Sequence, residues 1–413
     1  MNTQQNLAII KPIDILNLFL LFTFPLALII GNFIINLYIL LFSISFLINF
    51  KENKVVLKDK FFYLLVFFFI SLLINLFFSL NAENSFPRII KMIFIIFFIF
   101  EIKRLIQKYE IGYIQNMYKF WFLIFLVLSI DIIFEFLFGY NLVGNKSYME
   151  NRVASFFGDE LVAGAFYHGF VLFFFSYLVL RRTRNNILIF SIILVLLISF
   201  LIGERSNFIK LFISIVIFSS LIIKINYKLK LFIVSTIIII LITALNFSEK
   251  GYKNKYFDQI KIIATSNGYS KFLKQSQYGA HRDASMKIFK DNLFFGVGVK
   301  NFRHESGKKK YENNEFLQTN KRQSTHPHQI HHEFLSETGL FGYFSFLIFL
   351  LSSVYLGLKS YLKDKNIYQL SSIIFIITSM LPILPSGSFL STFTSGIFWL
   401  NFSIMVSYVK SKS

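Results

Sequence analysis

Four of the seven histidines lie in one short stretch between Thr325 and Gly342: His326, His328, His331 and His332. Histidine titrates near physiological pH, so its ring can accept a proton and return it. Pro327 fixes the backbone just before His328 and suits the opening of a helix. The stretch also joins the longest polar segment of the chain to a long apolar one. Titratable groups at such a junction between a polar and an apolar segment indicate a reaction site at a membrane surface.

Two arginines offer groups that could bind phosphate. Arg205 lies in a very short connection between two apolar segments, where a charge is costly unless it faces a polar cavity. Arg282 lies just before an amphipathic helix that we expect at 284–292. A guanidinium group can bind two oxygens of a phosphate or pyrophosphate in a fork. Nearby positive charge also keeps a histidine neutral and able to act as a base.

These polar residues also have simpler interpretations. Arg205 could anchor its span to lipid head groups, since arginine at a span end often does so. Arg152 and Glu160, in a second polar segment, could assist binding or could pair with each other. The pattern alone leaves both alternatives open.

A metal site is a further alternative for the histidine cluster. His328 and His332 are spaced to share one face of a helix and could ligate zinc. However, Glu333 is the only acidic residue clearly placed with them, and the chain has no cysteine. His331 and His332 could instead be polar residues at the start of a helix. We therefore expect no metal and no cofactor.

The composition excludes a soluble globular protein. The 413 residues are 55% hydrophobic and 19% aromatic, with a mean hydropathy of +0.60. Charged residues make up 15% of the chain, whereas soluble proteins carry about 25%. Long apolar segments recur, each able to cross a bilayer core of about 30 Å. The sequence predicts an all-α polytopic membrane protein.

The pattern of apolar segments predicts about twelve transmembrane helices and one large periplasmic loop domain. Residues 1–247 would form a bundle of about nine spans, 248–335 the loop domain, and 336–413 the last three spans with a tail. The expected spans are 15–30, 32–50, 61–79, 89–101, 118–138, 163–180, 187–203, 207–223, 229–247, 336–358, 368–384 and 388–409.

Lysines and arginines cluster in alternate short loops, which predicts the orientation of the chain. If these loops face the cytoplasm, both termini are cytoplasmic, and 139–162 and 248–335 face the periplasm. Arg88 and Arg205 are the exceptions among the opposite short loops. The same rule explains much of the +20 net charge, so we expect no nucleic acid partner.

The spacing around His328 is distinctive. His328-Gln329 is followed by nine residues and then Gly339-x-x-Gly342. Upstream, Arg282 is followed by Gly296-Val-Gly298 and Asn301-Phe302, and Arg205 lies at the outer end of a span. This arrangement resembles the bacterial O-antigen ligase and O-antigen polymerase family of inner-membrane proteins. Gln329 stands where asparagine is commoner in the polymerases, which favours the ligases.

The resemblance implies metal-independent, inverting glycosyl transfer on the periplasmic face of the inner membrane. The donor would be a glycan on undecaprenyl-pyrophosphate. The acceptor would be a hydroxyl of lipid A-core or of a similar molecule. The protein itself would be in contact with membrane lipids. Arg205 and Arg282 would bind the pyrophosphate, and His328 would take the proton from the acceptor. From their places in the sequence, His326, Arg152, Glu160 and Gln329 are candidates for supporting roles.

Two other functions remain open at this point. An O-antigen polymerase would use the same groups to join lipid-linked repeat units. A polysaccharide transporter would move glycans without chemistry, and would need charged residues near the middle of several spans. Only Asp131 and Glu135 stand out as such residues in the sequence.

Overall fold

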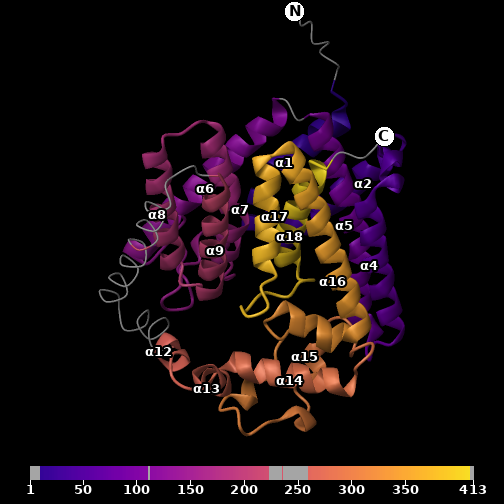
Figure 1. Cartoon of the computed structure of the whole chain (residues 1–413), viewed down its shortest axis with the longest axis vertical. Coiled ribbons are helices and arrows are strands. Elements are labelled where there is room, and N and C mark those ends of the chain that lie inside the picture. The colour runs from indigo at the N-terminus through magenta and orange to yellow at the C-terminus, as the bar shows by residue number, and fades with distance from the viewer. Residues whose placement is uncertain (1–9, 110–111, 223–234, 236–258, 410–413) are drawn as a thin grey trace, which may run out of the picture.

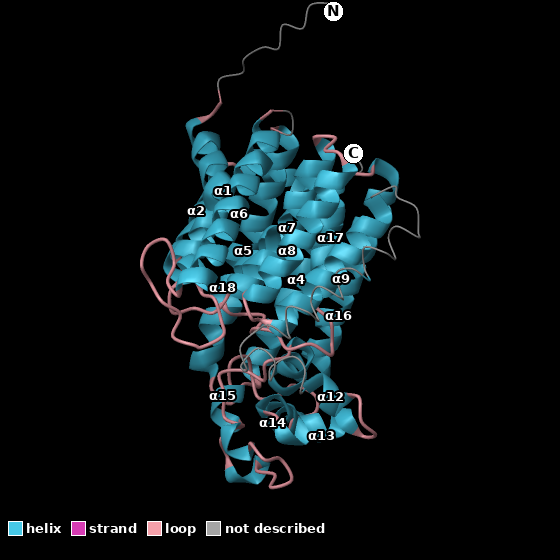
Figure 2. Ribbon diagram, turned by 90° about the vertical axis from the view of Figure 1, so that its left-hand side faces the viewer, coloured by secondary structure: helices cyan, strands magenta, loops and turns pink. Residues whose placement is uncertain are grey.

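The chain is helical throughout the part that the structure describes. The computed structural model describes residues 10–109, 112–222, 235 and 259–409, and these form helices without any strand (Figure 2). The α-helices are α1 (Pro12–Ile30), α2 (Asn32–Ile48), α3 (Phe50–Asn53), α4 (Lys60–Phe77), α5 (Ala82–Lys108), α6 (Tyr113–Phe138), α7 (Ala163–Leu180), α8 (Asn185–Leu201), α9 (Arg205–Ile222), α12 (Gln259–Ile263), α13 (Gly268–Gln275), α14 (Gln277–Asp291), α15 (Phe302–Glu305), α16 (Ile330–Asp364), α17 (Ile367–Ser379) and α18 (Thr392–Ser407). Short 3-10 helices are η1 (Lys54–Lys58), η2 (Ser155–Phe157), η4 (Lys309–Tyr311) and η5 (Thr319–Lys321).

The all-α prediction is confirmed. A helix lies at each expected span except 229–247, which apart from residue 235 falls outside the described residues. Within the described ranges, six helices are long and apolar enough to cross a membrane. The number rises to seven if the bent pair Asn32–Ile48 and Phe50–Lys58 counts as one span. The prediction of about twelve spans therefore stays a prediction.

The helices form a bundle with an appended layer at one end. In Figure 1, α12 to α15 lie together below the long helices, while α1 begins and α18 ends at the opposite end. Segments 248–335 and 139–162 were expected on one side of the membrane and both termini on the other. The separation of α12 to α15 from these helix ends agrees with that topology, although the side of the membrane stays a prediction.

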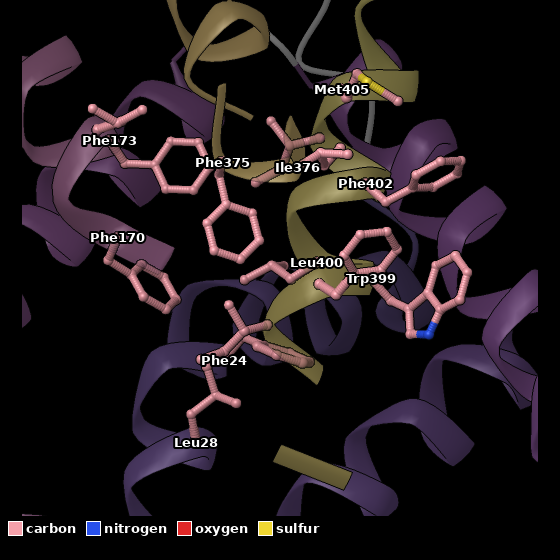
Figure 3. Packing of buried hydrophobic residues seen from close by; sticks show 14 of the residues in the cluster. Phe24, Leu28, Phe170, Phe173, Phe375, Ile376, Trp399, Leu400, Phe402 and Met405 are labelled. Atoms are coloured by element: carbon pink, nitrogen blue, oxygen red, sulfur yellow. The ribbon is translucent and has the colours of Figure 1, made fainter. Parts of the chain in front are cut away.

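An aromatic core surrounds α18, which is buried along its whole length. Trp399 and Phe402 of α18 pack against Phe349 of α16, and Leu400 lies near Phe24 of α1 and Phe375 of α17 (Figure 3). A helix that is apolar on all sides belongs in the interior of a bundle. This central helix thus gives the surrounding helices a fixed scaffold.

Two glycine segments interlock where the bundle meets the appended layer. α16 begins six residues before the expected span at 336–358, and its helical geometry breaks at Gly339, which has φ +63°. Beyond the break, the N–H groups of Leu340 and Phe341 donate to the carbonyls of Leu293 and Phe294 at 2.9 and 3.1 Å.

Before the break, carbonyl groups of α16 accept hydrogen bonds from the same segment, which follows α14. Val297 donates to the carbonyl of Ser336 at 3.0 Å, and Gly298 donates to that of Glu337 at 2.8 Å. A break in a helix leaves backbone groups that need partners. The segment after α14 supplies those partners, so the Gly296-Val-Gly298 and Gly339-x-x-Gly342 motifs form one structural unit.

Candidate active site

His328 lies just outside α16 in a constrained backbone conformation. Its φ is +55°, which is uncommon for a residue other than glycine. Its carbonyl accepts a hydrogen bond from the N–H of Ser386 at 2.9 Å. Gln329 then caps α16, because its side chain accepts from the N–H of His332 at 2.8 Å and donates to the carbonyl of Pro382 at 2.8 Å. Strained residues held this firmly often mark functional sites.

The position of His328 removes the geometric basis for the zinc alternative. Because α16 begins at Ile330, His328 and His332 do not share a helical face. Within the described segments, no group of three or more His, Cys, Asp or Glu side chains is arranged to hold a metal ion.

Three imidazole rings pack together at this point. The rings of His326 and His328 have centroids 4.1 Å apart, and that of His281 lies 5.0 Å from His328 in a nearly parallel plane. Ser324 contacts Nε2 of His328 at 3.2 Å, and Tyr278 packs edge-on against the same ring. No hydrogen bond is found at Nδ1 of His328 among the described residues.

Burial keeps these histidines neutral. It is the main cause that lowers the pKa of His328 to about 3, and the neighbouring rings of His326 and His281 lower it further, while Glu333 opposes them. Burial also lowers the pKa of His326 to about 4, with help from the charge of Lys300. The sequence predicted neutral histidines through nearby arginines, whereas the structure assigns the effect chiefly to burial.

A cavity of about 690 Å³ connects this cluster with the bundle. Its wall comes from α7, α9, α17 and α18 on one side and from α13, α14 and the histidine segment on the other. The polar and charged side chains on this wall include Arg152, His168, Glu204, Arg205, Asn207, Lys210, His326 and His328. Much of the remaining wall is aliphatic or aromatic.

A backbone contact brings the two arginines of this wall together. Val153 donates to the carbonyl of Ile202 at 3.2 Å, so 151–153 runs beside the turn that precedes Arg205. Gly203 permits the approach, because it has φ +78° and a Cβ there would overlap the carbonyl oxygen of Asn151. Nε of Arg152 is buried and has no hydrogen-bond partner in the described structure.

An acidic residue lies beside these cations. The carboxylate of Glu204 accepts from the N–H of Gly164 at 3.1 Å and from Nδ2 of Asn207 at 2.6 Å. Burial raises the pKa of Glu204, while these hydrogen bonds and the charge of Arg152 act in the opposite direction. Its side chain thus anchors the start of α9, on which Arg205 is the first residue.

A comparison with known families gives a match for part of the chain. Residues 170–347 match the family described as O-antigen ligase, a segment that runs from α7 into α16 and contains Arg205, Arg282 and His328. Through this segment, the chain is similar to the O-antigen ligase family. No curated protein matches the chain. The family is enzymatic and transfers glycans in lipopolysaccharide biosynthesis, and with the apolar helices it indicates a bacterial membrane protein.

The structure brings together some of the residues expected in this ligase-family site. His328, His326, Arg205 and Arg152 line the same cavity. Arg282 does not line it, although its Nη1 contacts the hydroxyl of Tyr269, a lining residue, at 3.4 Å.

Glu160 and Gln329 have other partners. Glu160 accepts a hydrogen bond from Asn32 at 2.8 Å, and no ion pair with Arg152 is found among the described residues. The alternative that these two pair with each other is therefore wrong. Gln329 serves as the cap of α16 and does not line the cavity.

Three lining or adjacent residues were not anticipated from the sequence. His281 stacks on His328, and His168 and Lys210 lie within apolar helices. Nζ of Lys210 donates to the carbonyl of Pro385 at 3.0 Å, which fixes the loop after α17 over the cavity. A charged residue inside an apolar span is itself a signal of a functional site, and this signal was present at Lys210.

Proposed function

We propose that the chain is an O-antigen ligase-like glycosyltransferase with His328 as its catalytic base. It would move a glycan from undecaprenyl-pyrophosphate to a hydroxyl of lipid A-core, or of a similar acceptor, on the periplasmic face. The observation that carries the proposal is that His328 and Arg205 line one cavity, whose wall combines charged side chains with many aliphatic and aromatic ones.

The composition of the cavity suits a lipid-linked pyrophosphate. Arg205 and Arg152 offer guanidinium groups to the phosphate oxygens. Ile209 lines the cavity and is 40% exposed, and the prenyl tail would pass beside it into the membrane. Arg282 would bind the head group from the rim, where it contacts Tyr269.

The reaction needs one proton acceptor and one stabilised leaving group. The acceptor oxygen would attack the anomeric carbon as the bond from that carbon to the pyrophosphate oxygen breaks. The bonding electron pair leaves with the pyrophosphate, whose negative charge Arg205 and Arg152 would offset. Attack opposite the leaving group inverts the anomeric carbon. The hydroxyl proton would pass to Nδ1 of His328.

The low pKa of His328 suits its resting state. A neutral ring is ready to accept a proton, but a pKa of about 3 makes it a weak base while the cavity holds no anion. A bound pyrophosphate brings negative charge next to the ring and raises this pKa. The donor would therefore strengthen the base that acts in its own transfer. No metal ion has a part in this sequence of steps.

The test is a transfer assay with purified protein and a lipid-linked glycan donor, with lipid A-core or a second lipid-linked repeat as acceptor. His328→Ala should lower the transfer rate by about 10²–10⁴-fold, as expected for loss of a general base. His304→Ala is the matched control, because His304 is an exposed histidine of α15 that does not line the cavity. Normal transfer by His328→Ala would overturn the catalytic assignment. Preference for the lipid-linked acceptor would identify a polymerase.

A further inference from the structure

A second cavity, of about 640 Å³, lies on the other flank of the appended layer, between α2, the first turns of α5 and the segment around α15. It shares no lining residue with the cavity of His328. Four cationic side chains line it: Arg88 and Lys91 of α5, Lys300, and Arg303 of α15. Glu83 is the only acidic residue on its described wall.

The cations of this cavity have few acidic partners. No ion pair is found for Arg88, Lys91 or Arg303 within the described segments, and Nε of Arg303 is buried without a hydrogen-bond partner. Lys91 instead donates to Asn36 at 2.7 Å. Only Lys300 lies near an acid, with its ammonium group 3.8 Å from Glu333.

Like charges held this closely repel one another. Burial is the main influence that opposes the charges of Arg88 and Lys91, and the charges of Arg303 and Arg88, respectively, add to it. Partly buried cations normally have an anion nearby. A phosphate group in the cavity would relieve the repulsion and accept hydrogen bonds from both guanidinium groups.

The rest of the wall points to an amphiphile. Leu40 of α2 and Phe94 of α5 line the cavity further along the bundle, and they are 41% and 37% exposed. Side chains of this type on the outside of a membrane bundle contact lipid tails. We propose that this cavity binds the phosphate-bearing head group of a membrane amphiphile, whose acyl chains lie against α2 and α5.

Lys300 connects this head-group cavity with the site of His328. Its side chain lines the head-group cavity, and its ammonium group forms a hydrogen bond with Ser388. The residue before Ser388 in the chain, Gly387, lines the cavity of His328. The charge of Lys300 also acts on His326. An amphiphile in the head-group cavity is therefore placed beside the histidine cluster, as an acceptor lipid would need to be. The acceptor role rests on the proposed function, whereas binding of the head group does not.

Binding can be measured without transfer by native mass spectrometry of the full chain in detergent. The probes are phosphorylated lipid A, chemically dephosphorylated lipid A, phosphatidylglycerol and phosphatidylcholine. The unmodified chain should retain phosphorylated lipid A at least about 10-fold more tightly than the dephosphorylated form, which corresponds to one charge-assisted hydrogen-bond network. The double variant Arg88→Gln, Arg303→Gln should lose this preference.

Three variants separate the outcomes. The control, Arg184→Gln with Lys290→Gln, removes the same charge from two exposed positions outside the cavity and should bind like the unmodified chain. Arg88→Lys, Arg303→Lys restores the charge and should recover most of the binding, which separates a charge effect from misfolding. His328→Ala should bind normally, so that a failed transfer mechanism leaves the head-group cavity intact.

The two phospholipid probes distinguish the source of the head group. Parallel loss of lipid A and phosphatidylglycerol in the double variant supports a site that also accepts bulk anionic phospholipid. Loss of lipid A alone supports a site selective for the acceptor. Unchanged retention of phosphorylated lipid A by the Arg88→Gln, Arg303→Gln variant would overturn the proposal.

Discussion

The imidazole of His281 lies flat against that of His328, with ring centroids 5.0 Å apart and planes inclined by 23°. Nε2 of His281 contacts the carbonyl of Lys321 at 2.9 Å, so this nitrogen carries the proton and the ring is held in place. Its Nδ1 is buried without a partner. His281 thus forms one side of the space that His328 occupies and limits the orientations of that ring.

His281 is expected to act as a positioning residue for His328. His281→Ala should lower the turnover number of transfer by about 10-fold, because the ring of His328 gains freedom. His281→Gln keeps a donor for the carbonyl of Lys321 and should recover most of this loss. Both variants remove an influence that lowers the pKa of His328, so the acidic limb of the pH profile should move to higher pH. If the acidic limb of the pH profile does not move in these variants, His281 has only a packing role.

Transfer should tolerate mild acid. In the proposed mechanism the neutral form of His328 is the active one, and its pKa of about 3 lies below the ordinary 6.5. As pH falls from 8 to 5, kcat/KM should therefore stay nearly constant, because the ring of the free protein remains unprotonated.

The profile of kcat should differ from that of kcat/KM. It reports the complex with donor, in which the pyrophosphate raises the pKa of His328, so its acidic limb should lie at higher pH. Initial rates over a range of donor concentrations give both curves, and recovery of activity after return to pH 7 controls for acid unfolding. A kcat/KM that is already halved at pH 6.5 would contradict the prediction.

The arginines should differ in their effect on donor affinity. Arg205→Gln should weaken binding of a lipid-linked pyrophosphate by about 10- to 100-fold, since a hydrogen bond to a charged group contributes about 1.5–3 kcal/mol. Arg282→Gln should weaken binding less, because Arg282 lies at the rim. Arg184→Gln, at the opposite end of the bundle, serves as the control. Equal losses for Arg205 and Arg282 would show that both contact the bound donor.

The interlocked glycines should be sensitive to alanine. Gly139 and Gly339 both have positive φ, but a Cβ at Gly139 meets no atom within 4 Å, whereas at Gly339 it would overlap the backbone of Phe294. Gly139→Ala should cost about 1–2 kcal/mol for the backbone conformation alone. Gly339→Ala should cost clearly more and lower Tm further, as measured by thermal unfolding in detergent. Similar Tm values for the Gly139→Ala and Gly339→Ala variants would show that the backbone at Phe294 can shift without loss of stability.

The sequence predicted the fold class and the central residues of the cavity. Hydropathy marks long apolar helices whatever their neighbours, because a bilayer requires backbone groups to be satisfied within each helix. The spacing around His328 and the isolated charge of Arg205 are local signals, and the structure brings these two residues to one cavity.

Contacts between distant segments were not predictable in this way. His281 and Arg282 are adjacent on α14, and successive helical residues point about 100° apart, so only one of the two can face His328. The sequence indicated a helix from residue 284, which left both residues outside it and gave no reason to prefer His281. The helix begins at Gln277, and it turns the histidine inward and the arginine outward.

The pairing of the chain segment 292–298 with the break in α16 has a consequence for exchange of parts between related proteins. Each segment supplies the hydrogen bonds that the other lacks, so neither is complete on its own. A chimera that takes its external segment from one relative and its final helices from another would bring together two halves shaped for different partners. Specificity can therefore be transferred between relatives only if segment 292–298 and the broken part of α16 are exchanged together.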